Sequence, residues 1–302
     1  MMKRFGRITL FTKIFWIFFA VSLIPLLMIA MTSYHQFSRS LNQHIRNKLI
    51  AISDGRQSLI ENNLTNISRL AVEKSQSPTL VVAFEKLDAA FKKPGINNEE
   101  LKLIASEYNG EFQRYFDANG YLYDIIFISN DGNVIFSAKN ENVFGKNIKD
   151  TIFKNTVLFD AVTSDNTFLS TRISDFDFYH PSNQPALFIA TPVFSKNSLL
   201  GTIALQMSPE VLYGFAQNYT GLPRTGDITF AKRVGDEVIF TTPARFKADA
   251  AFNYRAKFGS GFAVPMQKAL KGETGIGIAI DYRGKQVLAR WQYIPMLRWG
   301  MV

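Results

Sequence analysis

The sequence contains no cysteine, which excludes a disulfide framework, thiolate metal sites and a cysteine nucleophile. It also lacks a concentrated basic face interleaved with aromatic residues, although its formal net charge is +9. Four of the basic residues fall within positions 1–13, and the others are thinly spread. Because nucleic-acid binding requires such a face, we expect no nucleic-acid partner.

Catalytic motifs are equally scarce. His180 could complete a cation site with Asp175 and Asp177, but one loop would then supply all three ligands without visible support. No Gly-x-Ser-x-Gly elbow occurs, and the glycine-rich stretch 272–277 lacks the Lys-Ser/Thr of a phosphate loop. We therefore predict no catalytic residue, no metal and no cofactor in this chain.

Apolar residues, in contrast, are abundant. They make up 47% of the 302 residues, which is enough to build packed cores in two ordinary domains. No charge occurs between Lys13 and Arg39, and the apolar run between them is long enough to cross a bilayer. We predict a transmembrane helix over Ile14–Tyr34, contacting lipid. The basic tail 1–13 predicts a cytoplasmic N-terminus, with the rest of the chain outside.

The alternative to an anchor is a cleaved signal peptide. The apolar run is too long for a signal core, and no small-x-small cleavage site follows it, so the uncleaved anchor is favoured.

Residues 35–92 have a helical pattern and predict one long helix that breaks at Ser77-Pro78, with a further helix at Asn97–Asn109. An apolar stripe along it either packs on the protein's own sheet or pairs with a second copy, and both can hold along one helix. Self-pairing predicts a parallel homodimer. The stripe consists of Phe37, Leu41, Ile45, Leu49, Ile52, Leu59, Ile67 and Leu70.

The rest of the chain contains two copies of one hairpin unit. The first hairpin, residues 124–136, turns through Asp-Gly, and the second, residues 227–240, turns through Gly-Asp. A strand-like segment ending in glycine also recurs, at 188–201 and 287–300. One such hairpin is weak evidence, because antiparallel sheets commonly use this turn. Two features recurring in order predict duplicated modules of about a hundred residues each.

We assign the first module to residues 93–208 and the second to 209–302. Their alternating apolar residues predict antiparallel sheets fronted by helices, an α+β fold. The expected strands of the first module are 121–129, 134–137, 167–173, 186–194 and 199–207. In the second module we expect strands at 227–232, 237–241, 275–281, 286–293 and from Trp299, with helical segments at 211–219 and within 257–271.

The end of the chain is informative when the copies are compared. The first copy continues for about six residues after Gly201, whereas the chain stops two residues after the matching Gly300. We therefore expect a fragment cut in mid-strand, with a missing C-terminal part.

The layout resembles a known family. The segments that carry the resemblance are Tyr123–Phe127 with Asp131–Val134, Phe188–Val193 leading to Gly201, and Trp291–Pro295 with Trp299-Gly300. A membrane helix, a long helix and two PAS-like modules resemble the double Cache sensor domains of bacterial transmembrane receptors. The resemblance implies a periplasmic sensor anchored in the inner membrane. It also implies a second membrane helix, a HAMP linker and a cytoplasmic output module.

The function implied is ligand sensing, with the signal relayed across the membrane. A sensor histidine kinase is the favoured receptor type, and a chemoreceptor or a cyclase or phosphatase sensor is the alternative of the same fold. The alternative from another class is a module that binds a partner protein or an envelope component without a small ligand.

Comparison of the two copies locates the candidate site. The first copy carries about eight extra residues within Ser174–Pro185, a loop rich in groups that recognise small polar molecules. The alternative is an ordinary solvated loop. Arg172 could hold a carboxylate or pair with Asp175. The candidate ligand-binding residues are Tyr121, Phe127, Arg172, Asp175, Asp177, Tyr179, His180, Phe188 and Gln206.

The identity of the ligand stays open. One branch of the resembled family binds amino acids through an Arg, a Trp-Tyr pair and a late aspartate. The matching stretch Asn155–Phe159 lacks the first three, and Gln206 stands at the aspartate position. A neutral amide cannot compensate an α-ammonium group, so that scheme is not expected here.

The state of the pocket separates the two classes of function. A pocket closed by Phe127, Phe188 and Tyr179 would favour partner binding, whereas an open cavity lined by Asp177 and Arg172 would favour a small ligand.

Overall fold

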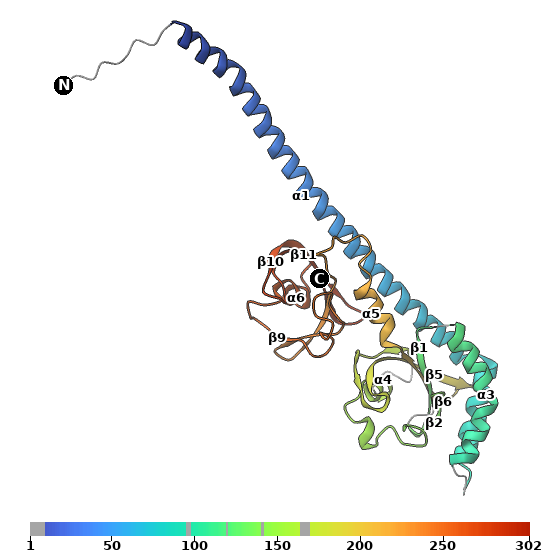
Figure 1. Cartoon of the computed structure of the whole chain (residues 1–302). Coiled ribbons are helices and arrows are strands. Elements are labelled where there is room, and N and C mark those ends of the chain that lie inside the picture. Colours follow the sequence, from blue (N-terminus) through green and yellow to red (C-terminus); the bar gives the residue numbers. More distant parts are fainter. Residues whose placement is uncertain (1–9, 95–97, 119, 140–141, 164–169) are drawn as a thin grey trace. The chain divides into compact units, whose positions relative to one another are not determined.

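The computed structural model describes residues 10–94, 98–118, 120–139, 142–163 and 170–302 (Figure 1). The chain forms two compact units, Met1–Ala51 and Ile52–Val302. One helix, α1 (Leu10–Ser75), contributes to both. The predicted break is confirmed, because α1 ends at Ser75 and α2 (Pro78–Phe91) begins with proline at its first turn. Helix α3 (Asn98–Ala118) is longer than predicted.

The first unit is the N-terminal part of α1. Its most apolar 18-residue window has a mean hydropathy of 2.6, and none of that window is buried. Within the described residues, α1 is the one helix long and apolar enough to cross a membrane. The helix predicted over Ile14–Tyr34 is therefore present.

The second unit begins with the rest of α1, and its buried face differs from the predicted stripe. Ile60, Leu64, Ile67 and Ala71 are each at most 3% exposed and pack into the core. Of the predicted stripe, only Ile67 belongs to this buried set. The polar residues Arg56 and Asn63 fill the two gaps of the predicted stripe, and the helix presents a neighbouring face to the sheet, so Leu59 stays 43% exposed.

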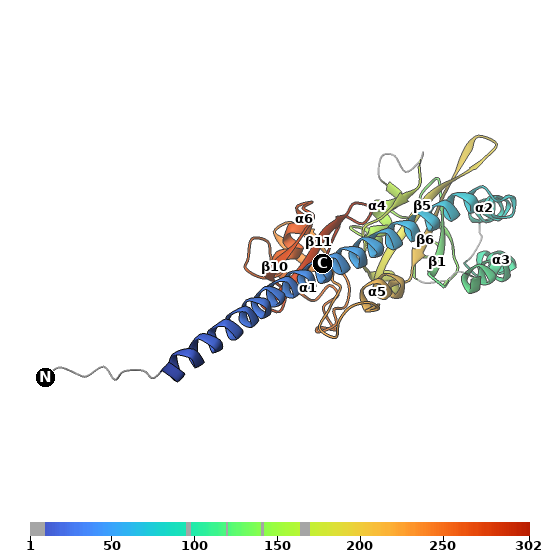
Figure 2. The ribbon, with the colours of Figure 1, turned by 90° about the horizontal axis from the view of Figure 1, so that it is seen from above.

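The first sheet has six strands in the order β2-β1-β6-β5-β3, and β4 also pairs with β5 (Figure 2). All its pairings are antiparallel. Two short helical segments follow β2: η1 (Thr151–Phe153) and α4 (Val157–Thr163). The strands are β1 (Leu122–Ser129), β2 (Val134–Ser137), β3 (Arg172–Ile173), β4 (Asp177–Tyr179), β5 (Gln184–Ser195) and β6 (Ser198–Met207).

This sheet is buried on both faces. One face, here the helix face, contacts α1 and α2 through residues such as Ile125, Ile203 and Leu205. The other, the loop face, packs against α4 through Ile126, Phe188 and their neighbours. Successive residues of a strand point to opposite faces, so the two sets alternate along β1, β5 and β6.

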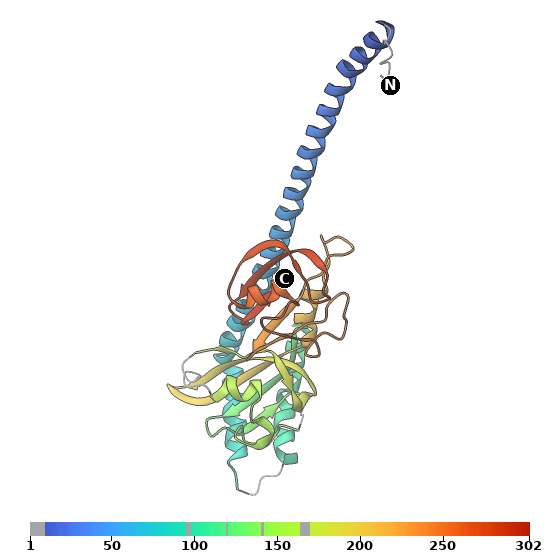
Figure 3. The ribbon, with the colours of Figure 1, turned by 90° about the vertical axis from the view of Figure 1, so that its left-hand side faces the viewer.

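The second sheet also has six strands, in the order β10-β11-β12-β7-β8-β9. Figure 3 shows this part of the chain in orange to red. Helix α5 (Pro209–Gln217) precedes it, and α6 (Val264–Leu270) packs on it. In each sheet, the first strand pairs with the next strand and with the last one, so the predicted duplication is present in the topology. The strands are β7 (Phe230–Val234), β8 (Glu237–Phe240), β9 (Arg255–Lys257), β10 (Gly275–Ile280), β11 (Gln286–Ile294) and β12 (Trp299–Met301).

Some predicted strand bounds were wrong. β7 begins at Phe230 rather than at 227, because residues 226–229 are irregular, and the Asp227 carboxylate there accepts a bond from the Ile228 N–H at 2.9 Å. Strands β4 and β9 were not predicted, since each has only three residues. The predicted strand 167–173 is observed only as β3, and residues 164–169 lie outside the described residues.

Gly201 offers a test of the central strand packing. A Cβ atom there would collide with the Ile128 backbone and lie 2.7 Å from the Phe84 ring. We expect Gly201→Ala to lower the free energy of unfolding by about 1–3 kcal/mol. The matched control is Gly214→Ala in α5, where no atom lies within 4 Å. That change should stabilise the protein by about 1 kcal/mol. Urea unfolding of the chain in detergent measures both, and equal effects would contradict the packing described.

Candidate functional site

The loop face of the first sheet holds a row of buried polar groups. Asp124 on β1 lies opposite Gln206 on β6, and Gln206 lies opposite Phe188 on β5. Directly opposed residues project from the same face of a sheet. All three are 0% exposed, so this row lies in the interior of the module.

Asp124 forms a structural clamp. Its carboxylate accepts bonds from Ser137 Oγ at 2.7 Å, the Ile125 N–H at 2.7 Å and the Lys139 N–H at 3.0 Å. The second module repeats this arrangement, because Asp227 accepts from the Ile228 and Arg245 N–H groups and from the Tyr282 hydroxyl. Sequence reasoning did not name Asp124 as a site residue. The available signal was a charge within an otherwise apolar strand.

Unlike the Asp124 carboxylate, the Gln206 amide has only one of its two polar atoms hydrogen-bonded within the described residues. Its Nε2 donates to Ser182 Oγ at 3.0 Å, whereas its Oε1 is buried and has no hydrogen-bond partner within the described residues. An unsatisfied buried acceptor costs about 1–3 kcal/mol. Natural proteins keep such groups where a ligand, an ion or water completes the bonding.

Two buried side-chain donors on the loop face also lack a hydrogen-bond partner within the described residues. Arg172 lies opposite Ala190, a loop-face residue, and Gln184 precedes Ala186 on β5 by two positions. Within the described part of the chain, Arg172 Nε and Gln184 Nε2 are buried and lack a partner. The loop face therefore offers one acceptor and two donors to a polar molecule. Gln184 was not predicted, although the side-chain alternation of β5 could have indicated it.

The loop Ser174–Pro185 directs some of its side chains toward this face. Tyr179 and Phe188 are 0% exposed and meet edge to face, with ring centroids 4.9 Å apart. His180 points outward and is exposed, with its ring 5.2 Å from that of Phe178. The loop therefore closes over the sheet with Tyr179 and Ser182, and His180 does not join the buried row.

Asp175 and Asp177 point toward the second module instead. Their carboxylates lie 3.1 Å and 2.7 Å from Nζ of Lys232 on β7, which also donates to the Phe176 carbonyl at 3.0 Å. The Lys232 side chain is 5% exposed, whereas those of the two aspartates are 41% and 50% exposed. The pairing of Asp175 with Arg172, one of the two readings considered from the sequence, is wrong because Lys232 occupies that carboxylate.

Phe176 strengthens the same junction. It is 0% exposed, and its ring lies 5.4 Å from that of Phe252 and 5.7 Å from that of Trp299. The extra loop thus links the two modules through one buried ring and one buried cation.

The remaining two predicted residues lie away from the loop face. Phe127 is on the helix face, where its ring stacks on Phe84 at 5.3 Å. Tyr121 is partly buried against the helix-face core, and burial raises the pKa of its phenol. Neither contributes to the row around Gln206.

The row, the loop and the duplicated sheets can be compared with known proteins. The family model described as Cache domain matches residues 32–302, which is most of the chain. The chain belongs to the Cache domain family. It is a double Cache sensor, as the two sheets indicate. Cache domains are ligand-binding sensor domains rather than catalysts.

Solved structures with the same fold are sensor domains of histidine kinases and chemoreceptors. The extracellular domain of soHK1S-Z6, described as a histidine kinase, has a TM-score of 0.56 at 12% identity and covers 87% of this chain and 94% of its own. The sensor domain of the V. cholerae histidine kinase DctB has a TM-score of 0.55 at 15% sequence identity, and the match covers 88% of this chain and 96% of that domain. The ligand-binding domain of the Campylobacter jejuni chemoreceptor Tlp3, in complex with 4-methylisoleucine, has a TM-score of 0.53 at 10% sequence identity. The match covers 84% of this chain and 87% of that domain. A comparison with curated proteins finds no match.

The junction between the modules of this Cache sensor can be tested through its charges. Asp175→Asn together with Asp177→Asn leaves the buried Lys232 cation unpaired, and we expect a loss of about 3 kcal/mol in unfolding free energy. Lys232→Met leaves two half-exposed carboxylates that water can solvate, so its cost should be about 1 kcal/mol. The comparison uses urea unfolding of the full chain.

The exposed pair Lys247–Asp249 supplies the control, because Lys247→Met should change the free energy of unfolding by less than about 0.5 kcal/mol. If the Asp175→Asn, Asp177→Asn variant is at least as stable as Lys232→Met, then Lys232 is not a buried charge that needs the two carboxylates.

Proposed function

We propose that the chain is the extracytoplasmic sensing region of a bacterial signalling receptor in the inner membrane. A sensor histidine kinase is the favoured output, and a chemoreceptor or a cyclase or phosphatase receptor is the alternative. Residues 93–208 form the membrane-distal module and bind a small polar molecule on the loop face. Residues 209–302 form the membrane-proximal module. The observation that carries this proposal is the buried Gln206 Oε1, which has no hydrogen-bond partner in the described residues and lies on the same sheet face as the donors Arg172 Nε and Gln184 Nε2.

The chemistry of the loop face selects the ligand class. The ligand donates a hydrogen bond to Gln206 Oε1 and accepts a bond from the Arg172 guanidinium, because Arg172 pairs with Ala190, two positions along β5 from the residue opposite Gln206. A small organic acid that also bears a hydroxyl or amide group meets both needs, since guanidinium groups favour carboxylates. The neighbouring carboxylate of Asp124 already accepts three bonds from neutral protein donors, so few of its acceptor positions remain for an α-ammonium group.

The loop Ser174–Pro185 provides a route from ligand to second module. Tyr179 and Ser182 border the ligand face, and Asp175 and Asp177 hold Lys232. A ligand that binds one loop packing better than another shifts the population toward it. That shift changes the contact with β7, and the signal continues through the proximal module toward the membrane.

Binding of a partner protein is the second candidate function. Tyr179 and Phe188 fill the loop face and are fully buried, as expected for a closed pocket. The buried polar atoms beneath them favour a small ligand over this candidate, because a vestigial pocket would be apolar.

A thermal-shift screen of the full chain in detergent tests the ligand proposal. Organic acids, amines, purines and sugars are screened, since a ligand at a hundred times its Kd stabilises by about 2.7 kcal/mol. We expect a hit among the hydroxy acids, with affinity lowered at least tenfold by Gln206→Ala and by Arg172→Gln. Gln217→Ala, which removes an exposed amide on α5, is the control and should bind normally.

Hydroxy-acid hits whose affinity survives both site substitutions would overturn the site. A screen without hits would overturn small-ligand sensing and favour the partner-binding function.

The membrane anchor and dimer belong to the same proposal. Residues 1–13 stay in the cytoplasm, Ile14–Tyr34 contact lipid, and the exposed apolar part of α1 pairs with a second copy in parallel. Phe37, Leu41 and Ile45 are 68%, 48% and 40% exposed in the single chain.

The absence of cysteine makes the dimer easy to test. Leu41→Cys introduces the only thiol of the chain, and a parallel pair brings the two copies of that thiol together. We expect a disulfide-linked dimer on non-reducing gels after mild oxidation in membranes. Gln43→Cys projects from the opposite side of the helix and should cross-link at least fivefold less. Equal cross-linking at both positions would contradict a specific pairing face.

A further inference from the structure

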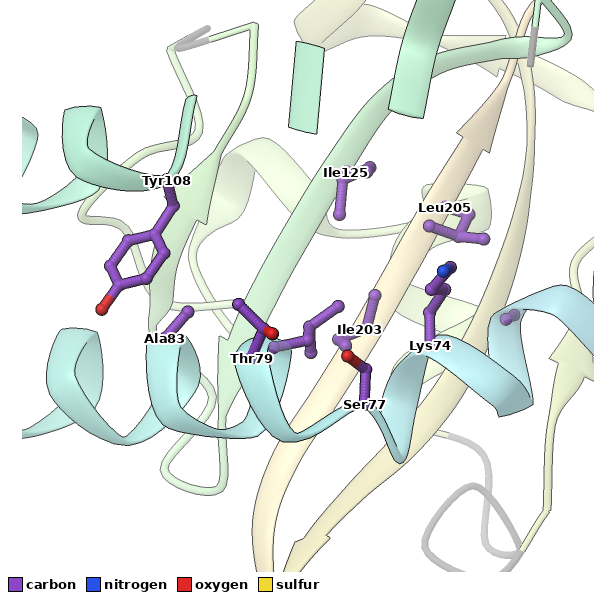
Figure 4. Close-up of a pocket in the computed structure, with 10 residues that line it drawn as sticks. Lys74, Ser77, Thr79, Ala83, Tyr108, Ile125, Ile203 and Leu205 are labelled. Atoms are coloured by element: carbon purple, nitrogen blue, oxygen red, sulfur yellow. The ribbon is translucent and has the colours of Figure 1, made fainter. Parts of the chain in front are cut away.

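A cavity lies on the helix face of the first sheet, away from the row around Gln206. It has a volume of about 40 Å³ and lies where α1 ends and α2 begins (Figure 4). Its floor is formed by Ile125, Ile203 and Leu205, which project from β1 and β6 toward the helices. Since these residues alternate with Asp124 and Gln206 along their strands, the two sites are on opposite faces of the sheet.

The walls of this cavity combine apolar and polar side chains. Ala71 of α1 and Ala83 of α2 are each 1% exposed and line it with single methyl groups. Its polar lining residues are Lys74, Ser77, Thr79 and Tyr108, and Tyr108 lies at the opposite end from Lys74 in Figure 4. The Lys74 side chain is 34% exposed, and its ammonium lies 3.9 Å from the mostly exposed Glu73 carboxylate. Ser77 makes no side-chain capping bond to α2, so its hydroxyl can donate to a ligand.

The size of the cavity limits its occupant. One water-sized probe requires about 10–15 Å³, so 40 Å³ accommodates on the order of three non-hydrogen atoms. Drug-sized ligands need roughly 300–1,000 Å³ and are excluded. An amino acid is also disfavoured, because its ammonium group would approach the Lys74 cation. The occupant that fits is a short alkyl chain with one anionic group at the rim.

We propose that this cavity is a second small-molecule site, which binds a short-chain monocarboxylate of three or four carbons. The alkyl chain lies against Ile125, Ile203 and Leu205. The carboxylate accepts charge-assisted bonds from Lys74 Nζ and a bond from the Ser77 hydroxyl. The bound molecule contacts α1, α2 and the sheet together, and therefore stabilises the helix break at Ser77-Pro78. Because α1 also contains the candidate membrane span, this site acts on the helix that enters the membrane.

Isothermal titration of the full chain in nanodiscs with propionate, butyrate and hexanoate tests this proposal. We expect saturable binding of propionate and butyrate, and at least tenfold weaker binding of hexanoate. Ala83→Leu fills the cavity and Lys74→Gln removes the cation, so each should weaken propionate binding at least tenfold. The matched controls are Ala89→Leu on the exposed side of α2 and Lys102→Gln on α3, which should bind propionate normally.

The outcomes distinguish this site from the loop face. Gln206→Ala should leave propionate binding unchanged. The proposal is overturned if propionate gives no saturable heat, if binding survives both Ala83→Leu and Lys74→Gln, or if Gln206→Ala alone abolishes it. Should Ala83→Leu fail to fold, Ala83→Val fills part of the same space and carries the same expectation. Failure here leaves the ligand screen on Gln206 and Arg172 unaffected, because those variants change the opposite face.

Discussion

A buried ammonium group determines how the two modules of this Cache sensor fit together. Lys232 is removed from water on the second sheet, and a charge in that position requires partners. Asp175, Asp177 and the Phe176 carbonyl supply them from the first module. The loop that provides these partners is thereby anchored to the second module. Its other half places Tyr179 and Ser182 over the buried row on the first sheet. The contact between the modules and the cover of the loop face therefore involve the same loop.

Much of the fold could be predicted from the sequence, because the local patterns agree with the final topology. Turn residues and alternating apolar residues identified both hairpins, and Ser77-Pro78 marked the helix break. Comparing the copies also identified the loop Ser174–Pro185. The direction of its side chains could not be predicted, since Lys232 lies far along the chain from the loop. Strand β1 is buried on both faces, so its pattern gave no indication that Phe127 faces the helices.

The two copies share a framework and differ in their inward-facing chemistry. Asp124 and Asp227 occupy corresponding positions, and the carboxylate of each accepts a hydrogen bond from the N–H group of the next residue. Sequence reasoning used both as the first residues of the recurring hairpins but assigned neither to the site. Unlike Asp124, Gln206 keeps one buried oxygen without a protein partner in the described residues. The difference between a satisfied and an unsatisfied buried polar group is thus what separates scaffold from candidate site.

The extra loop has two halves with different freedom to vary. Residues 175–177 are tied to Lys232 and Trp299, so substitution there disturbs the contact between modules. Residues 179–184 border the loop face, where we propose that the ligand binds. Under that proposal, new specificity can evolve, or be selected in a library, within these six positions while the contact between the modules is kept. Solved structures of the same fold share only 10–15% identity with this chain, so the fold itself tolerates wide change in sequence.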